Sequence, residues 1–378
     1  MKVVFPYIAQ THQIPHSFPI AAELATQRPD WAVHIACSTD EQERLVRRLM
    51  KLYPDARLRI DRLWINWLHR LYQRLRGEGI PPKLMVLIGN RGYFRRFDAA
   101  VVPERTSLVL KKLRLPKLRM IWTSHGAGDR AIGYAADLDQ FAFQILAGPK
   151  QVLRMRVEGS LLEGSHHLGC YPKFDLVDRL DAQRRRLFDN DRPTVLYNPH
   201  FEAGLSSWPK HGFAVLDHFA QSKDWNLIFA PHIRLFDRRD AATQARLDRY
   251  RTLPHVLIDT GSDASIDMTY TQAADVYLGD VSSQIAEFMV RPRPCLFINS
   301  HDAAWQNSPD YLFWQLGTVI ANVDDLDLAL SDAVANHGHW IERQGQYFRD
   351  TFDADPEAIG RSAAAGAAAI ASFLETSR

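Results

Sequence analysis

The strongest local pattern in the chain is a pair of serines at the start of a helical segment. Residues 274–287 read Ala-Asp-Val-Tyr-Leu-Gly-Asp-Val-Ser-Ser-Gln-Ile-Ala-Glu, so a polar turn at Asp280 joins an apolar run to Ser282 and Ser283. Serines are typical helix N-caps, and free N–H groups and hydroxyls at a helix start bind anions. The pattern therefore predicts a diphosphate site, with Glu287 one turn further along to hold ribose hydroxyls. A plain capped helix with a solvated Glu287 is the structural alternative.

A histidine follows another apolar run, at residues 119–123. His125 precedes Gly126, which lets a ligand approach the backbone closely, so we expect Gly126 beside the donor. An imidazole with an ordinary pKa near 6.5 can accept the proton of an attacking hydroxyl. His125 is one of 15 histidines, so a capping or core role is the alternative to catalysis.

Polar residues also follow two apolar runs in the second half of the chain. His232 and Arg234 come after residues 226–230, and both can neutralise a leaving phosphate. Asn198 and His200 come after residues 194–197. We expect all four to line the donor pocket, with a surface pair at a strand end as the alternative for the first two.

The first loop of the chain offers candidate acceptor contacts. His12, Gln13 and His16 follow the first apolar run, and Arg130 supplies a cation after His125. These side chains are expected to bind the acceptor or to serve structure only. No acidic pair suited to a metal is visible, so neither a metal nor another cofactor is expected.

These segments occur in the order of the motifs of the CDP-glycerol glycerophosphotransferase family, the teichoic-acid polymerases and primases. The chain resembles that family over roughly residues 120–300. Asp280, Ser282 and Ser283 match its signature, residues 122–126 resemble its HG motif, residues 195–201 its strand ending in PT, and residues 228–234 its HP motif. The resemblance implies the GT-B fold, His125 as catalytic base and His232 in contact with the donor phosphate.

The sequence also departs from the family at four points. Glu287 stands where the family usually has Asp, and Val281 replaces a Tyr. The Thr and Lys that follow the HG motif are absent, although Arg130 restores a cation. His200 occupies the PT segment, which has lost an Arg. These changes bear on the activated group that the chain uses more than on its fold.

Short apolar runs alternate with helical patterns, which is typical of parallel βαβ units. Strands are expected at 3–8, 32–37, 84–88, 99–102, 119–123, 194–197, 226–230, 256–258, 276–278 and 295–298. Helices are expected at 18–27, 41–52, 58–76, 213–221, 241–251, 283–290 and 356–374.

The predicted fold is α/β, with two doubly wound Rossmann-like domains facing a central cleft. The charged stretch 175–192 is the expected boundary, which gives an N-terminal acceptor domain at 1–180, a nucleotide-donor domain at 190–355 and a C-terminal helix at 356–378. Ligands in open α/β sheets bind at the carboxyl ends of the strands, so the strand-end loops should share one cleft.

Composition excludes several classes of protein. Of 378 residues, 46% are hydrophobic and 24% charged, which argues against disorder. The net charge of +2 and the lack of a recognition module argue against nucleic acid as a partner. Three cysteines without a C-x-x-C pair predict neither a disulfide framework nor a thiolate zinc site. No leader peptide or membrane span is visible, so a cytoplasmic protein is expected.

One part of the chain is strongly basic. Residues 44–119 hold 20 Lys or Arg against five Asp or Glu, an excess of 15 positive charges. A helix over 58–76 would place Trp64 and Trp67 on one apolar stripe, with arginines on its other faces. Such a helix suits an anionic membrane surface, and a core-facing helix with a solvated basic side is the alternative.

The sequence thus predicts a transferase on the inner face of the cell membrane. It would move glycerol phosphate, or a similar polyol phosphate, from a CDP-activated donor to a hydroxyl of a lipid-linked glycan or cell-surface polymer. A GT-B glycosyltransferase that uses a nucleotide sugar, or a related nucleotide-sugar epimerase, is the first alternative. A non-catalytic scaffold that binds glycan or lipid is the second.

Overall fold

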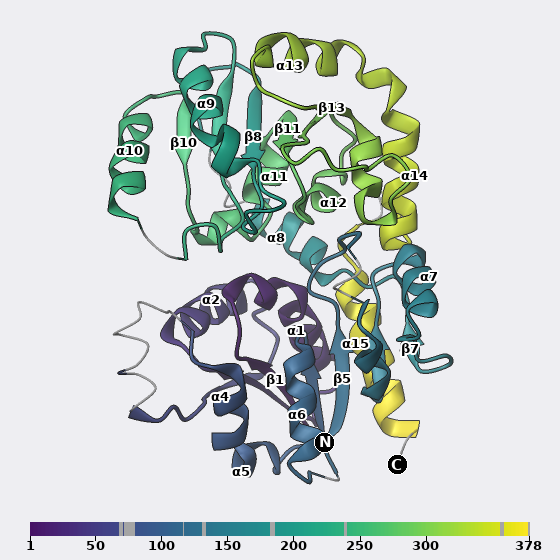
Figure 1. Ribbon diagram of the computed structural model, residues 1–378. Helices are drawn as coiled ribbons and strands as arrows, with labels where there is room; N and C mark the ends of the chain where they lie inside the picture. The colour runs from purple at the N-terminus through teal and green to yellow at the C-terminus, as the bar shows by residue number, and fades with distance from the viewer. Residues whose placement is uncertain are drawn as a thin grey trace.

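Parallel β-sheets organise both halves of the chain (Figure 1). The computed structural model describes residues 1–67, 71, 80–115, 117–130, 134–181, 186–237, 240–355 and 359–376. Within these residues, one sheet has seven strands in the order β3-β2-β1-β4-β5-β6-β7, and the other has six in the order β10-β9-β8-β11-β12-β13. Every pairing is parallel, for example Tyr197 of β8 opposite Phe229 of β9. Two doubly wound sheets were predicted, and the structure confirms them.

The central strands are buried along their whole length, which explains why they are continuous apolar runs in the sequence. The first sheet consists of β1 Lys2–Tyr7, β2 Ala32–Cys37, β3 Leu58–Arg62, β4 Ala99–Val102, β5 Arg119–Thr123, β6 Phe143–Ile145 and β7 His166–His167. The second consists of β8 Thr194–Asn198, β9 Asn226–Phe229, β10 Val256–Ile258, β11 Val276–Gly279, β12 Cys295–Ile298 and β13 Thr318–Ile320. The predicted boundary at 175–192 lies between β7 and β8.

Helices cover both faces of each sheet. In the first half they are α1 Phe18–Gln27, α2 Asp40–Met50, α4 Lys83–Gly89, α5 Arg91–Phe94, α6 Val109–Lys112, α7 Pro149–Val157 and α8 Val177–Asp181. In the second half they are α9 Trp208–Gln221, α10 Ala241–Arg251, α11 Thr269–Ala273, α12 Gln284–Phe288, α13 Leu326–Ala335, α14 Ile341–Phe352 and α15 Ser362–Thr376. Short 3-10 helices, such as Thr11–His16, Arg105–Leu108 and Pro172–Leu176, connect them.

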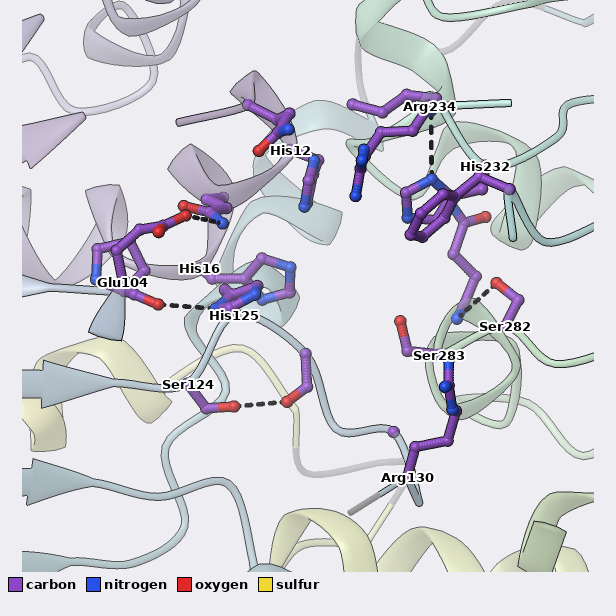
Figure 2. Close-up of a pocket in the computed structure, with 18 of the residues that line it drawn as sticks. His12, His16, Glu104, Ser124, His125, Arg130, His232, Arg234, Ser282 and Ser283 are labelled. Carbon is purple, nitrogen blue, oxygen red and sulfur yellow. Dashed lines mark hydrogen bonds between the residues drawn. The ribbon is translucent and has the colours of Figure 1, made fainter. Parts of the chain in front are cut away.

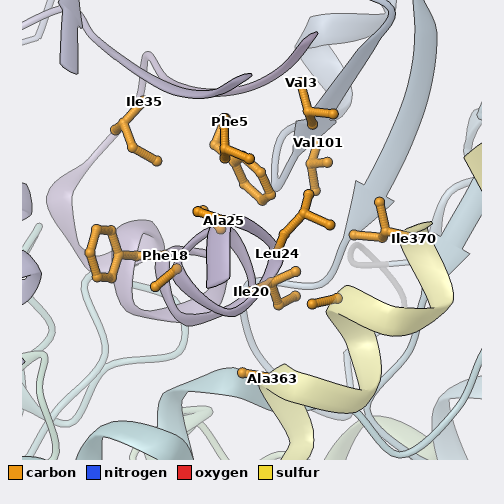
Figure 3. Packing of buried hydrophobic residues seen from close by; sticks show 14 of the residues in the cluster. Val3, Phe5, Phe18, Ile20, Leu24, Ala25, Ile35, Val101, Ala363 and Ile370 are labelled. Carbon is orange, nitrogen blue, oxygen red and sulfur yellow. The ribbon is translucent and has the colours of Figure 1, made fainter. Parts of the chain in front are cut away.

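The last helix returns to the first sheet. Ala363 and Ile370 of α15 belong to the same buried cluster as Ile20 and Leu24 of α1, which in turn pack on β1 and β2 (Figure 3). A Cβ on Gly366 would lie 2.6 Å from the sulfur of Cys170, so only glycine lets α15 approach this closely. The helix was predicted from residue 356. It begins at Ser362, and residues 356–358 lie outside the described part of the chain.

Two predictions in the first half are wrong. The run at 84–88, predicted as a strand, is part of α4: Val86 and Leu87 are buried, whereas Leu84, Met85 and Ile88 are 45–47% exposed. Such a run cannot be assigned by periodicity alone, because a short apolar segment can form either a buried strand or part of a helix.

The helix predicted over 58–76 is also wrong at its start. Leu58–Arg62 is the edge strand β3, in which Leu58 and Ile60 alternate with polar residues. Residues 63–66 are irregular, and residues 68–70 and 72–79 lie outside the described part of the chain. Trp64 and Trp67 are 60% and 69% exposed, so they do not pack in the core.

The strand orders place one switch point in each sheet. The strand order reverses between β1 and β4 in the first sheet, and between β8 and β11 in the second. The loops after these strands diverge and leave a crevice, which is where open α/β sheets bind ligands. The loops concerned begin at Ile8, Pro103, Pro199 and Asp280.

Candidate functional site

A cleft of about 770 Å³ opens between the two sheets, at the carboxyl ends of their strands. The loops after β1, β4 and β5 line one wall, and the loops after β8, β9 and β11 line the other. Figure 2 shows His12, His16 and His125 on one side, and His232, Arg234, Ser282 and Ser283 on the other. Both switch points therefore open into the same cleft.

Most of the residues singled out from the sequence lie in this cleft. Twelve of the fourteen line it: His12, Gln13, His16, His125, Gly126, Arg130, His200, His232, Arg234, Ser282, Ser283 and Glu287. They come from the loops after five strands and from helix α12, which holds Glu287. Their assigned roles stay predictions, but the structure brings their side chains together.

Asn198 and Asp280 were expected to contact the donor, and the structure places both behind the cleft wall. Asp280 is 1% exposed, and its carboxylate accepts hydrogen bonds from the backbone N–H of His200 at 2.8 Å and of Ser207 at 2.5 Å. Burial raises its pKa to about 6, and these hydrogen bonds oppose the rise. Asn198 donates to the carbonyl of Ala230 at 2.6 Å. Both residues thus hold the loops that carry the cleft side chains.

The hydrogen bond of His125 determines which of its nitrogens can act as a base. Its Nδ1 lies 2.7 Å from the carbonyl oxygen of Pro103, and a carbonyl can only accept. In the neutral ring Nδ1 therefore carries the hydrogen, and Nε2 keeps a free lone pair. The ring is exposed to the cleft, so this lone pair is available to a substrate hydroxyl.

A buried carboxylate lies beside His125. Glu104 is 6% exposed and forms an ion pair with Lys83 at 2.7 Å, and it accepts a hydrogen bond from the amide of Gln13 at 2.6 Å. Removal from bulk water deep in the cleft lowers the pKa of His125, and the charge of Glu104 raises it in part. Glu104 therefore supports the basicity of His125.

The opposite wall carries imidazoles of the other tautomer. Nδ1 of His232 accepts the backbone N–H of Arg234 at 3.2 Å, so the neutral ring carries its hydrogen on Nε2. Burial, with His200 and Arg234 nearby, lowers the pKa of His232 to about 3. At neutral pH His232 is thus an uncharged N–H donor, whereas His125 is a base.

His12 lies between histidines of the two walls, and His16 lies near it in the same loop. The ring of His12 lies 6.3 Å from that of His125 and 5.8 Å from that of His232, between ring centres. Burial lowers the pKa of His12 and His16 well below its ordinary value, and neighbouring cations and imidazoles add to the effect. Nδ1 of each ring is buried and has no hydrogen-bond partner among the described residues.

The helix that follows the two serines is shorter than predicted. It spans only Gln284–Phe288 instead of 283–290, so its dipole is small, and the hydroxyl of Ser283 forms no capping bond. Ser283 is exposed to the cleft, and a Cβ on Gly126 would lie 3.7 Å from its hydroxyl oxygen. An anion bound here would therefore be held by hydroxyls, imidazoles and Arg234 more than by a helix end.

Glu287, predicted to hold ribose, is already engaged. Its carboxylate forms a buried ion pair with Lys173 at 2.7 Å and accepts a hydrogen bond from the hydroxyl of Tyr171 at 2.8 Å. It lines the cleft and keeps lone pairs beyond these bonds. Arg130, predicted for the acceptor, faces Glu202 of the other half at 3.5 Å.

The charges of the cleft lining are paired. Each acidic side chain in the lining has a cation within ion-pair distance; the pairs are Lys83–Glu104, Arg105–Asp137, Arg130–Glu202, Lys150–Asp129 and Lys173–Glu287. Arg234 pairs at 3.4 Å with Asp237, which lies outside the lining. No lone carboxylate is left in the described lining to repel a phosphate.

The sequence reasoning missed several lining residues. Glu104 directly follows Pro103 at the end of β4, so a strand-end rule would have found it. Lys83 begins α4, which was mistaken for a strand. Lys173 lies in a 3-10 helix next to the expected boundary and had no local signal. No group of three or more potential metal ligands is present among the described residues.

Comparison with known proteins identifies the fold. No protein-family model and no curated protein sequence matches the chain. A variant of the wall teichoic acid polymerase TagF with CDPG has a TM-score of 0.63 at 12% identity, covering 100% of this chain and 89% of that one. A putative UDP-N-acetylglucosamine 2-epimerase from Listeria monocytogenes gives 0.64 at 14% identity, covering 99% and 97%. MnaA of S. aureus with UDP gives 0.62 at 12% identity, covering 99% and 97%. The predicted GT-B fold is confirmed.

Proposed function

We propose that this protein transfers a polyol phosphate from a CDP-activated donor to a hydroxyl of a lipid-linked glycan or cell-surface polymer, with CDP-glycerol as the simplest donor. One observation carries the proposal: a free imidazole Nε2 at His125 faces hydroxyl, imidazole and guanidinium donors across a single cleft. The fold is also that of TagF in a structure with CDPG. The motif order of residues 122–298 supports the same donor.

The reaction follows from the tautomers in the cleft. The acceptor hydroxyl attacks the phosphorus that bears glycerol, and Nε2 of His125 takes its proton. A new O–P bond forms as the bond from that phosphorus to the bridging oxygen breaks, and CMP leaves with the bridging oxygen. His232, Arg234 and Ser283 stabilise the negative charge that develops on CMP, because their N–H and O–H groups donate to its phosphate. Glu287 is proposed to hold the ribose.

Product analysis tests this proposal. The purified protein is incubated with CDP-glycerol and a membrane-extracted acceptor, and nucleotides are separated by chromatography. We expect CMP to accumulate in step with acceptor elongation. Formation of CDP, or no turnover with any CDP-polyol, would contradict the proposal.

A nucleotide sugar is the second candidate donor, because two of the compared structures are a putative UDP-N-acetylglucosamine 2-epimerase and MnaA with UDP. Buried Glu104 beside His125 also provides a carboxylate that a sugar reaction can use. Release of UDP, or epimerisation of a UDP-sugar without release, would favour this candidate. A scaffold would bind ligand and turn over neither donor.

The surroundings of His125 predict an unusual pH dependence. Its neutral ring is the active form, and its pKa is lowered, so activity should persist below the ordinary histidine pKa. We expect kcat/KM for the acceptor, measured at saturating donor, to stay level as the pH falls through about 6.5 and to decrease only at lower pH. Because Glu104 raises the pKa of His125, Glu104→Gln should move the pH at which activity is lost in acid to a still lower value. If both proteins lose activity at or above about pH 6.5, the ordinary histidine pKa, His125 is not the base.

An apolar surface beside the cleft is proposed to bind the membrane. Leu84, Met85 and Ile88 of α4 are exposed, and the ring of Trp64 lies within 3.2 Å of the position that a Cβ on Gly89 would occupy. This α4 surface lies in the segment with the excess of 15 positive charges, which suits anionic lipid headgroups. Lys83 at the start of α4 lines the cleft, so a lipid-linked acceptor would enter beside it. None of the described helices is long and apolar enough to cross a bilayer.

Vesicle binding tests the α4 surface. Much less of the triple variant Leu84→Ser, Met85→Ser, Ile88→Ser than of the wild-type protein should co-sediment with vesicles of anionic lipid. The variant lacks the apolar groups that enter the membrane interface. Leu328→Ser is the control, since Leu328 is 71% exposed on α13 in the other half. Equal binding by both variants would rule out this surface. Binding at the inner face of the cell membrane is the location that the proposal requires.

A further inference from the structure

Two neighbouring strands of the second sheet are followed by turns of similar sequence. Residues 197–202 read Tyr-Asn-Pro-His-Phe-Glu, and residues 229–234 read Phe-Ala-Pro-His-Ile-Arg. Tyr197 and Phe229 are register partners in the β8–β9 pair. His200 and His232 therefore leave the sheet at equivalent positions, each three residues further on.

The two histidines also make equivalent hydrogen bonds. Nδ1 of His200 accepts the backbone N–H of Glu202 at 3.1 Å, as Nδ1 of His232 accepts that of Arg234 at 3.2 Å. Both neutral rings thus carry their hydrogen on Nε2. Both residues line the cleft, and neither Nε2 has a hydrogen-bond partner among the described residues. The ring centres are 5.7 Å apart, so the two rings are neighbours on the same wall of the cleft.

An aromatic ring and a buried carboxylate hold this pair. The ring of Phe201 lies 4.5 Å from that of His200 and 4.6 Å from that of His232, and the guanidinium of Arg234 lies 4.2 Å from its centre. His200 is 7% exposed, and its backbone N–H donates to buried Asp280. The site is therefore built before any ligand arrives.

We propose that His200 and His232 form a clamp that binds one phosphate group of the donor nucleotide through both Nε2–H groups, and that the pair takes up a proton as the phosphate binds. The proposal rests on the proposed function only in that a nucleotide diphosphate occupies this wall of the cleft. The motif around His200 lacks the Arg that the resembling family carries. A ring that becomes charged only when phosphate binds would take the part of that permanent cation.

The charges around the pair explain the proton uptake. In the free cleft, burial lowers the pKa of His200 to about 4, opposed by Glu202 and assisted by Arg130 and Arg234. Burial, His200 and Arg234 lower that of His232, and the ring of His12 faces it at 5.8 Å. Both rings are thus neutral at neutral pH. A phosphate anion within hydrogen-bond distance favours the charged ring, so one pKa rises on binding.

Calorimetry in buffers of different ionisation enthalpy measures the uptake directly. The probes are CDP-glycerol and a UDP-sugar, whose diphosphates are esterified at both ends and do not titrate near neutrality. We expect fractional proton uptake per nucleotide that grows as the pH is lowered from neutrality, and tighter binding at lower pH, by up to about tenfold per pH unit. His125→Asn should leave the uptake unchanged, because His125 lies on the opposite wall.

Matched substitutions separate the hydrogen bond that each ring donates from the protonation of the ring. His200→Gln places an N–H near the Nε2 position without a titrating ring, so binding should remain at about pH 8 while the uptake falls. His200→Asn keeps an acceptor for the N–H of Glu202 but lacks the outward donor, so affinity should fall about tenfold. The corresponding His232 variants repeat the test if the His200 variants do not fold, which thermal unfolding shows.

The outcomes distinguish this inference from the proposed function. Unchanged proton uptake in the double variant His200→Gln, His232→Gln would overturn the clamp, as would wild-type affinity in both asparagine variants. Binding of the UDP-sugar alone, with uptake that depends on the pair, would overturn the CDP donor and support the clamp. Binding of neither nucleotide would overturn both.

Discussion

Replacement of His125 by asparagine is expected to lower kcat by roughly 10²- to 10⁴-fold, the usual contribution of a general base. The asparagine amide can still donate to the carbonyl of Pro103, as Nδ1 of His125 does at 2.7 Å. The loop should therefore keep its position while the lone pair of Nε2 is lost. The affinity for CDP-glycerol, measured by calorimetry, should change little, because the donor contacts lie on the opposite wall.

A matched histidine provides the control. Nδ1 of His166 lies 2.8 Å from the carbonyl of Leu162, the same kind of bond as in His125, but His166 does not line the cleft. His166→Asn should keep wild-type turnover. If His125→Asn keeps turnover as well, or if it loses donor affinity as much as rate, His125 is not the base.

Replacement of Lys173 by methionine is expected to destabilise the protein by about 3–5 kcal/mol, the usual cost of breaking a buried ion pair. The side chains of Lys173 and Glu287 are 4% and 5% exposed, and Lys173 supplies both carboxylate oxygens with a hydrogen bond. The variant would leave the charge of Glu287 buried with only the hydroxyl of Tyr171 as donor. Urea unfolding measures the loss.

A second substitution should restore most of this stability. In Lys173→Met, Glu287→Gln the buried charge is gone, and the amide oxygen at position 287 can still accept from Tyr171. If Glu287 holds the ribose, the double variant should bind the nucleotide more weakly than the wild-type protein does, although its stability returns. Arg47→Met, which breaks the exposed pair with Glu43, is the control and should change little. A stable single variant would contradict the role given to the pair.

The cleft residues could largely be predicted because they directly follow strands. In a parallel sheet the carboxyl ends of the strands meet at one edge, so His200 and His232 of the second sheet converge without any knowledge of tertiary contacts. His125 follows a strand of the first sheet and meets them because the two sheets face one cleft, as predicted for the GT-B fold. The order of the apolar runs was enough to place them. Asp280 could be located by the same rule, but its function in holding the turn at Ser207 depends on a contact between residues 73 apart.

Some elements at the edges of the sheets could not be predicted as well, although the edge strand at 256–258 was. β7 and β13 have only two and three residues, too few to show a periodicity. The run 84–88 follows two prolines and has apolar residues at every position, so only the packing of Val86 and Leu87 decides for a helix. The ion pair Lys173–Glu287 joins residues 114 apart and has no local signature.

One motif residue has a structural explanation. Arg293 lies within the segment of roughly residues 120–300 that resembles the family, but it does not line the cleft. Its guanidinium donates to the carbonyls of Thr271 and Phe288, near the ends of α11 and α12, and lies 3.7 Å from the ring centre of Phe288. A cation at helix C-termini is stabilising. The motif therefore combines residues that face the cleft with residues that fix the short helix beside it.

The most direct test is a crystal structure of the His125→Asn variant with CDP-glycerol bound. The proposed function requires the diphosphate between Ser283, His232 and Arg234, at hydrogen-bond distance from their donors, and the glycerol-bearing phosphorus directed toward position 125. A nucleotide whose base, and not its phosphates, lies against Ser283, or one bound outside the cleft, would contradict it.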